Sequence, residues 1–393
     1  MSRTSHPLLA AAALALATAA CAPRPAATPA PERPSLDTEE FAGLIAQMSE
    51  PGGFFPSENL VSNETSYLHV MGALRQLGAS GGAYIGVGPD QNFSWIAEIR
   101  PEIAYIIDIR HDNLLQHLLF KALFQQARNR LEFLCLMTGT PPPADLEAWN
   151  DADIERIIEY VDSTKSEPER MEEILLEVRR LVQTYGYPLD VRDLENIRRI
   201  HLTFFEDGLG VRYSNRGRFA FYPTWRQLIL ETDLDGNRSS YLATESRWRW
   251  VKDLERRNLI IPVVGDLAGP QALAAIGRDI AGRGLVVSAF YVSNVEQYLF
   301  QQNGFTRFAA TLAGLPYAGN SMIIRSYFRG RHPQNVPGHS STQILERIAD
   351  FDRSFAAGDF RSYYDVVTLN ALPLLPRVPD DTARSESRMR SAR

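Results

Sequence analysis

Short apolar runs alternate along this chain with longer segments in which apolar residues recur every three or four positions. A short apolar run bounded by glycine or polar turn residues is typical of a buried strand, and the longer period is typical of a helix with one buried face. The runs predict strands at 83–88, 104–110, 259–266, 284–292 and 320–328. The helical segments around them are 64–77, 92–100, 113–136, 244–258, 270–282 and 293–301. Because strands joined through helices pair in parallel by right-handed crossovers, the pattern predicts an α/β fold with a mostly parallel sheet and helices on both faces.

The alternation is interrupted once. Prolines 141–143 break the chain, and the segment after them, to about residue 200, has the pattern of two or three amphipathic helices with dense charge. Residues 201–240 are mixed and contain turn signals. The expected parts of the folded chain are a first core segment at 41–140, a mostly helical insertion or cap at 141–243, a second core segment at 244–375 and a disordered tail at 376–393.

The N-terminal residues have the composition of an export signal. Arg3 precedes an alanine-rich apolar stretch at 8–20, which is too short to span a bilayer as a mature helix. The small residues before Cys21 resemble a bacterial lipobox, with Thr18 where a large apolar residue is usual. The resemblance implies that residues 1–20 are a signal peptide and that Cys21 is lipidated after cleavage. Ordinary cleavage near Ala20, with a soluble periplasmic product, is the alternative.

Residues 21–40 follow as a linker rich in proline and alanine, which behaves as an extended spacer. With lipid on Cys21, the linker would hold the folded part off a membrane. The expected location is therefore the bacterial cell envelope, at the periplasmic or outer-membrane face. No other stretch reaches 18 consecutive apolar residues, so we expect no internal transmembrane helix. We expect the second cysteine, Cys135, to be a buried thiol without a disulfide partner.

Composition narrows the function classes without selecting one. The chain has 393 residues, a formal net charge of −6 and 45% hydrophobic residues, which is close to a globular average. The bulk charge gives no basic footprint, so no nucleic-acid partner is expected. Two cysteines exclude a disulfide scaffold and a cysteine-based zinc site.

The first predicted strand leads into a glycine-rich turn that opens the next helix. Glycines there let a ligand approach the backbone, and the first N–H groups of the helix are free to bind it. Asp108 lies 22 residues after Gly86, at the end of the second strand, where an acid can accept hydrogen bonds from ribose hydroxyls. Gln91 stands where the dinucleotide fingerprint has its third glycine, which disfavours a nicotinamide or flavin site. The candidate contacts of a nucleoside-type ligand are Gly86, Gly88, Asp90, Asn92 and Asp108. The alternative is a tight turn with Asp108 as a helix cap.

With these motifs, residues 64–140 and 244–330 resemble the class I S-adenosylmethionine-dependent methyltransferases, which have a Rossmann-like core. In that family the glycine-rich loop approaches the methionine part of the cofactor, and Gly86 and Gly88 match it. Tyr84 stands where the family often has an acid, and Asp90 where it has a third glycine. The resemblance implies S-adenosylmethionine as the cofactor, with Asp108 near its ribose and Asp266 near its adenine. The chain also resembles bacterial lipoproteins with a methyltransferase-like core, a likeness that implies no particular substrate.

Catalytic candidates come from the same family and from the turn after Asp108. The family places catalytic or substrate-binding groups after the fourth strand, where Asn294 and Glu296 stand in this chain. Either side chain could orient a methyl acceptor. The segment 293–296 is not the Asn/Asp-Pro-Pro-aromatic motif of enzymes that methylate amino groups. His111 could act as a general base, because the pKa of a free histidine is about 6.5. Alternatively, it could be a solvated or capping residue.

The segment 52–64, just before the core, mixes aromatic residues with Glu58, Asn59, Asn63 and Glu64. It could fold over the cofactor cleft, or it could be an N-terminal loop and helix cap. Tyr67 and His69 follow it in positions that are typical of packing residues.

No metal site is expected. Asp233, Asp235 and Asn237 resemble the start of a calcium loop, but the loop's glycine and final glutamate are not in the required places, so they predict a turn. His332 and His339 lie seven residues apart, a spacing that matches no common metal site. Their loop is therefore expected to be structural or substrate-facing.

Two classes of function remain. The first is an exported methyltransferase that binds S-adenosylmethionine or a related nucleoside and methylates an unknown acceptor, a reaction that needs alignment and desolvation more than covalent help. The second is a non-catalytic, lipid-anchored binding or envelope protein that reuses the fold, because S-adenosylmethionine is not expected to be plentiful outside the cytoplasm. A nicotinamide-dependent enzyme is a third interpretation.

Overall fold

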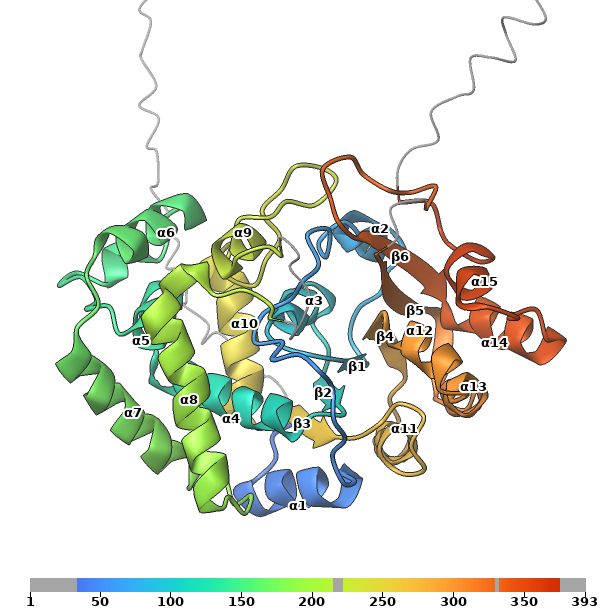
Figure 1. Ribbon diagram of the computed structural model, residues 1–393, viewed down its shortest axis with the longest axis horizontal. Helices are drawn as coiled ribbons and strands as arrows, with labels where there is room; N and C mark the ends of the chain where they lie inside the picture. Colours follow the sequence, from blue (N-terminus) through green and yellow to red (C-terminus); the bar gives the residue numbers. More distant parts are fainter. Residues whose placement is uncertain (1–33, 215–221, 329–331, 375–393) are drawn as a thin grey trace, which may run out of the picture. The chain divides into compact units, whose positions relative to one another are not determined.

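The computed structural model describes residues 34–214, 222–328 and 332–374 (Figure 1). Six strands form one sheet in the order β3-β2-β1-β4-β5-β6, in which β6 alone is antiparallel to its neighbour. The strands are β1 (Ala83–Gly86), β2 (Ile103–Asp108), β3 (Ile260–Val264), β4 (Val287–Ser293), β5 (Tyr317–Tyr327) and β6 (Thr342–Arg347). The predicted α/β fold with a Rossmann-like, mostly parallel sheet is therefore confirmed.

Helices cover both faces of this sheet, as predicted. The core helices are α1 (Thr38–Met48), α2 (Met71–Gln76), α3 (Gln91–Ile99), α4 (His111–Gln126), α10 (Glu245–Arg256), α11 (Ala272–Gly282), α12 (Val295–Gln301), α13 (Phe305–Ala313), α14 (Ile348–Ala357) and α15 (Tyr363–Thr368). One face carries α3, α4 and α10, and the other carries α1, α11, α13 and α14 (Figure 1). The residues of β1 and β3 are all buried, which explains why these strands are continuous apolar runs in the sequence.

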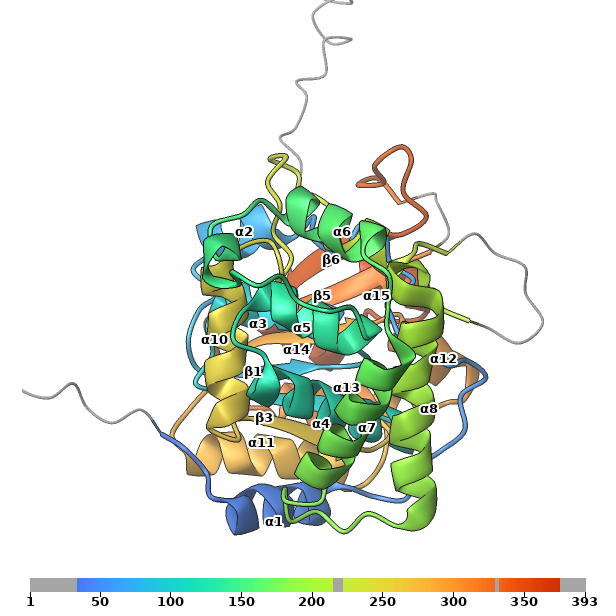
Figure 2. The same ribbon diagram turned by 90° about the vertical axis from the view of Figure 1, so that its left-hand side faces the viewer.

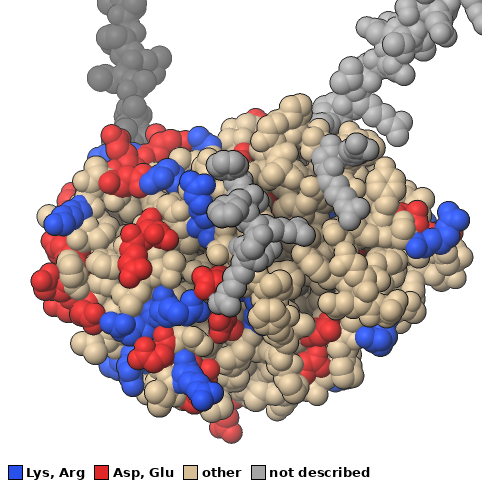
Figure 3. Space-filling view, viewed as in Figure 1, with Lys and Arg blue, Asp and Glu red and all other residues tan. Residues whose placement is uncertain are grey.

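The segment between the two halves of the core is mostly helical. Its elements, with the helix that leads into it, are α5 (Arg130–Thr138), η1 (Glu147–Trp149), α6 (Ile154–Ser163), α7 (Pro168–Val182), α8 (Val191–Asp207), η2 (Gly208–Gly210) and α9 (Trp225–Ile229). Both α7 and α8 pack on α4, so they form an outer layer over one face of the core (Figure 2). Charged side chains of both signs gather over this layer, on the left of Figure 3, whereas the right-hand part of that face shows few.

Three of the predicted boundaries that were wrong are explained by hydrogen bonds of polar side chains. Residues 65–70 form turns and only α2 is helical, since buried polar groups of this segment bond to other parts of the chain, as Ser66 does to Ser341. The long helix predicted at 113–136 is divided into α4 and α5, where Asn129 caps the first turn of α5. Asp37 caps α1, so a helix begins within the segment expected to be a linker.

Several predictions fall on residues that the structure does not describe. These are the signal peptide at 1–20, Cys21, most of the linker and the whole tail at 376–393. Among the described parts of the chain, no helix is both long and apolar enough to cross a membrane. Cys135 is fully buried, as predicted, and burial raises the pKa of its thiol to about 12.

Candidate functional site

A cavity lies at the carboxyl-terminal edge of the parallel strands. In open α/β sheets, ligands bind outside this edge at the point where the strand order reverses. In this sheet the reversal lies between β1 and β4. Residues that directly follow the strands line the cavity, and they are Val87 and Gly88 after β1, 109–110 after β2, 265–267 after β3, and Asn294 and Val295 after β4. The cavity volume is about 160 Å³, whereas one buried water needs only about 10–15 Å³ on the same measure. A small organic molecule therefore fits this place.

The segment between α1 and α2 lies against the same cavity. Its lining residues are Phe54, Phe55, Asn59, Ser62, Asn63 and Glu64. The segment is fixed to the strand ends, because Gly53 N donates a hydrogen bond to Ile109 O at 2.8 Å. Of the two interpretations of this segment, the one in which it folds over the cleft agrees with the structure. The Phe54 side chain is 83% exposed, so it is available to pack on a bound molecule.

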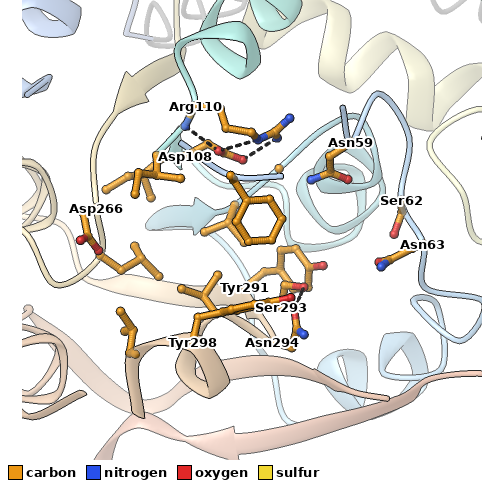
Figure 4. Close-up of a pocket in the computed structure, with 18 of the residues that line it drawn as sticks. Asn59, Ser62, Asn63, Asp108, Arg110, Asp266, Tyr291, Ser293, Asn294 and Tyr298 are labelled. Carbon is orange, nitrogen blue, oxygen red and sulfur yellow. Dashed lines mark hydrogen bonds and ion pairs between the residues drawn. The ribbon is translucent and has the colours of Figure 1, made fainter. Parts of the chain in front are cut away.

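Asp108, the expected ribose-binding acid, forms an ion pair with Arg110 (Figure 4). Its Oδ1 accepts hydrogen bonds from Arg110 N at 2.9 Å and Nε at 3.1 Å, and its Oδ2 accepts one from Nη2 at 2.8 Å. Arg110 is also held by Glu58 O, to which Nη1 donates at 3.0 Å. A carboxylate has about four acceptor positions, so Asp108 keeps one for a ligand. The sequence predicted the acid at this place but not its arginine partner.

A second polar cluster includes Tyr291 and Ser293, which lie across the cavity from this pair (Figure 4). The sequence did not predict that these side chains meet Glu64. Glu64 Oε1 accepts hydrogen bonds from Tyr291 OH at 2.5 Å and Ser293 Oγ at 2.6 Å, and Gln343 Nε2 donates to Oε2 at 3.1 Å. Burial raises the pKa of Glu64, although these hydrogen bonds oppose the change. In the sequence, Glu64 stands at the start of the helix predicted at 64–77, a position that equally fits a helix cap.

Ser293 stands in a strained conformation at the edge of the cavity. Its φ is +51°, in the left-handed region that side chains other than glycine avoid. Such a backbone costs of order 1–3 kcal/mol and persists where the surroundings hold it. Its hydrogen bond to Glu64 holds the hydroxyl at the cavity, next to Asn294. The strain therefore coincides with the place where the strand order reverses.

Gly86 and Asn92 shape the glycine-rich turn from its inner side and are not among the cavity-lining residues. Asn92 Nδ2 donates to the carbonyl oxygens of Val87 at 2.9 Å and Pro89 at 2.8 Å, and Asn92 Oδ1 accepts from Tyr84 OH at 2.7 Å. A Cβ on Gly86 would lie 2.0 Å from Asn92 Oδ1, so packing requires glycine there. The prediction that these two residues contact the ligand is corrected: they position the turn.

Asp90 also points away from the cavity. Its Oδ2 accepts hydrogen bonds from Trp225 Nε1 at 2.7 Å and Tyr241 OH at 3.2 Å, both of which belong to the segment at 141–243. Burial raises the pKa of this carboxyl group to about 6, against the opposing effect of both donors. Asp90 therefore fixes the start of α3 to the insertion, and its predicted contact with a cofactor is corrected.

Gly88 and Gln91 are the residues of the turn that face the cavity. Gly88 has a φ of +83°, which explains the need for glycine at this position. The Gln91 side chain is buried, and its Oε1 has no hydrogen-bond partner in the described parts of the chain. Buried acceptors are rarely left unpaired, so a ligand with a hydrogen-bond donor fits here.

The structure separates the three catalytic candidates. Asn294 lines the cavity, as does Asp266 on the opposite side (Figure 4). Glu296 is fully buried away from the cavity and accepts hydrogen bonds from Arg325 Nε at 2.5 Å and Nη2 at 3.1 Å. His111 lies outside the cavity, with Nε2 3.0 Å from Asp193 Oδ1. The roles predicted for Glu296 and His111 at this site are therefore corrected, since both side chains are engaged elsewhere.

The predicted turn at 233–237 is present. Asp233 Oδ1 accepts hydrogen bonds from Asp235 N at 3.0 Å and Asn237 N at 2.9 Å, and Arg75 Nη2 donates to Asp233 Oδ2 at 2.9 Å. The carboxylate is thus occupied by the chain itself, as in an Asx turn.

The chain matches a known protein family. The family model described as a domain of unknown function, DUF7790, matches residues 59–357, about three quarters of the chain. The match includes the glycine-rich turn, all six strands and the insertion. No curated protein matches the sequence.

Proposed function

This chain belongs to the DUF7790 family of domains of unknown function, and from its cavity we propose that it binds a nucleoside-type small molecule, with S-adenosylmethionine as the first candidate. We further propose that the bound cofactor serves methylation of an acceptor whose identity is open. The resemblance to class I methyltransferases supports this choice among nucleosides.

The position and chemistry of the cavity carry the proposal. It lies where the strand order reverses, with Asp108 at the end of β2 and one acceptor position of that carboxylate unused. The unpaired Gln91 Oε1 adds a second acceptor in the same cavity. The ribose hydroxyls and the amino group of such a ligand could donate hydrogen bonds to Asp108 and to Gln91 Oε1.

Each end of the cavity would hold a different part of such a ligand. Asp108 would accept a hydrogen bond from a ribose hydroxyl, and Asp266 with Leu267 would lie beside a base. Asn294 and the buried Glu64 would orient the opposite end or the acceptor. The segment with Phe54 would exclude water from the ligand, which favours reactions of charged groups. When bound, S-adenosylmethionine supplies an electrophilic methyl group on a sulfonium centre.

A second candidate, a non-catalytic binding protein, is favoured by one observation. Two of the three predicted catalytic residues, Glu296 and His111, are engaged away from the cavity. S-adenosylmethionine with a radiolabelled methyl group distinguishes the two candidates. If the chain binds it but transfers no label to any envelope fraction, the binding protein is favoured over the methyltransferase.

Calorimetric titration of the full chain in mild detergent tests the binding site. We expect S-adenosylmethionine and S-adenosylhomocysteine to bind, and Asp108→Asn to weaken binding by about 10- to 100-fold, because hydrogen bonds to a charged acceptor contribute about 1.5–3 kcal/mol. The matched control is Asp112→Asn, which changes an exposed aspartate outside the cavity. No binding at millimolar ligand would contradict the proposed function, and unchanged binding by Asp108→Asn would contradict the site.

We also propose that the chain is a lipoprotein anchored in the bacterial cell envelope through Cys21. The sequence from the basic start to Cys21 supports this proposal. In a bacterial expression host, Cys21→Ala should abolish the acyl mass on the mature N-terminus and move the protein from the detergent phase to the aqueous phase. Cys135→Ala is the matched control. Unchanged partitioning and mature mass of the Cys21→Ala variant would disprove lipidation.

A further inference from the structure

Three side chains from distant parts of the sequence meet beside α2, outside the cavity described above. His69 comes from the turns before α2, Glu231 follows α9, and His339 lies in the connection between β5 and β6. These elements all lie in the upper part of Figure 1. Each side chain offers one ligand atom, and the three atoms lie within 4.8 Å of one another. We propose that His69, Glu231 and His339 bind a divalent transition-metal ion, with Zn²⁺ as the first candidate.

The donor set selects the class of cation. Two imidazole nitrogens and one carboxylate oxygen suit zinc and its neighbours, whereas calcium and magnesium prefer oxygen ligands. Zinc lies about 2.0–2.2 Å from such atoms, so tetrahedral ligands stand about 3.4 Å apart. The three atoms, now within 4.8 Å of one another, need to approach by at most about 1.4 Å to reach this spacing. Glu231 and His339 are only half-buried, which leaves their side chains room for that rotation.

His339 is already oriented as a ligand. Its Nδ1 lies 3.1 Å from Thr65 O, to which it can donate a hydrogen bond. That bond places the proton on Nδ1 and leaves the lone pair of Nε2 free for a metal ion. Metal-binding histidines almost always have such a partner for the second ring nitrogen.

His69 differs from the structural histidines of this chain. The rings of His117, His201 and His332 each have Nε2 within 3.0 Å of a backbone carbonyl oxygen, of Gly88, Leu136 and Val367 respectively. His69 is also buried, but no hydrogen bond to its ring nitrogens is found among residues 34–214, 222–328 and 332–374. Its ring lies edge-on to that of His339, with centroids 4.5 Å apart.

Glu231, the acidic member of the set, is hydrogen-bonded through only one of its two oxygens in the described parts of the chain. Glu231 Oε1 accepts a hydrogen bond from Thr232 N at 2.8 Å, and its other oxygen has no partner in the described parts of the chain. An imidazole and a carboxylate oxygen to which no hydrogen bond is found in the described parts of the chain therefore lie close to an oriented histidine, and a metal ion would engage all three. The sequence could not show this site, because its members are 69, 231 and 339 along the chain and share no local spacing.

Three protein ligands leave a fourth position, as in catalytic zinc sites. A surface groove adjoins the site and is lined by Thr65, Arg212, Tyr222, Glu231, Gly338 and His339. Water or an anion can therefore reach the fourth position from this groove. The ion would also join the turns before α2, the insertion and the β5–β6 connection, so its binding should stabilise the folded chain.

Zinc titration of the full chain tests the proposal. After treatment with a chelator and dialysis, the wild-type protein in mild detergent should bind one equivalent of Zn²⁺, measured by calorimetry and by elemental analysis. His339→Gln and Glu231→Gln should each weaken binding by on the order of a hundredfold, because each removes one of three ligands. His111→Gln is the matched control, since it removes a surface histidine remote from the three ligands. Circular dichroism checks that each variant is folded.

Cobalt gives a readout that does not depend on the variants' stability. Co²⁺ added to the wild-type chain should give visible d–d absorption of a low-coordinate site, which Zn²⁺ removes and millimolar Mg²⁺ does not. No Zn²⁺ binding by the wild-type chain would overturn the proposal. So would equal Zn²⁺ affinity in the wild type, His339→Gln and Glu231→Gln, or binding that His111→Gln weakens as much.

Discussion

Replacing Arg325 with methionine should lower the free energy of unfolding by about 3–5 kcal/mol, because the change leaves two buried carboxylates without a counter-charge. Arg325 is fully buried on β5 and forms ion pairs with Glu296 of α12 and Glu346 of β6. Its guanidinium group also lies over the Phe351 ring of α14, 5.4 Å from the centroid. One residue thus pairs with acids from two different elements, α12 and β6. Urea unfolding followed by circular dichroism measures the loss.

Two further variants separate charge from packing. Arg353→Met is the matched control: it removes an arginine that is 75% exposed and pairs with Asp350 on the surface of α14, where ion pairs contribute little. Arg325→Lys keeps the charge but loses the planar fork, so its loss should fall between the two. If Arg325→Met is no less stable than Arg353→Met, the buried charges are not what this arginine stabilises.

The difference in the free energy of unfolding between the wild type and Arg325→Met should shrink as the pH falls. Burial raises the pKa of Glu346 even with Arg325 present, and removal of the cation should raise it further. A group whose pKa is higher in the folded state contributes stability at low pH and loses it as the pH rises. The variant should therefore differ least from the wild type in acid and most above neutral pH.

The sequence predicted the sheet because its central strands are buried on both faces. Uninterrupted apolar runs such as 103–107 then stand out from the helical segments. The antiparallel strand β6 was missed, because four of the six residues of Thr342–Arg347 are polar and only Ile344 and Leu345 are apolar. Thr342, Gln343 and Glu346 of this strand are buried, and Gln343 bonds to Glu64, far along the chain. Local composition cannot reveal partners of this kind.

The candidate site was predicted in part for the same reason. Gly88, Asp108, Asp266 and Asn294 lie at the ends of strands or within two residues after them. Strand ends converge at one edge of a parallel sheet, so sequence position alone places these residues there. Glu64 and Tyr291 meet only because of tertiary packing. Glu296 is two residues from Asn294, yet the turn of α12 directs its side chain to Arg325. A helix rotates neighbouring side chains by about 100° per residue, so adjacency does not imply a shared site.

The insertion is joined to the glycine-rich turn through one buried acid, Asp90. Its carboxylate accepts hydrogen bonds from Trp225 and Tyr241, and burial raises its pKa from 3.8 to about 6. The folded chain therefore binds this proton more tightly than the unfolded chain. The stability that Asp90 contributes is complete below pH 3.8 and is lost as the pH rises through about 6.

Asp90→Asn should therefore stabilise the protein above pH 6. A shift of about two pKa units corresponds to about 3 kcal/mol, which is the upper limit of the gain. The amide oxygen can still accept the hydrogen bond from Trp225 Nε1, and the amide carries no charge to desolvate. Urea unfolding between pH 4 and pH 8 should show the stability of Asp90→Asn rising relative to the wild type up to about pH 7 and remaining constant above it.

The control for this experiment is Asp359→Asn, which neutralises an exposed aspartate and should show no such rise. A difference in stability between Asp90→Asn and the wild type that stays constant from pH 4 to pH 8 would mean that Asp90 does not titrate in this range.

The same variant also tests whether the Asp90 side chain takes part in ligand binding. Because the Asp90 side chain lies outside the cavity, Asp90→Asn should leave the affinity for S-adenosylmethionine unchanged, whereas Asp108→Asn should reduce it. Stability and ligand binding would then respond to different acids of the same strand–turn–helix unit.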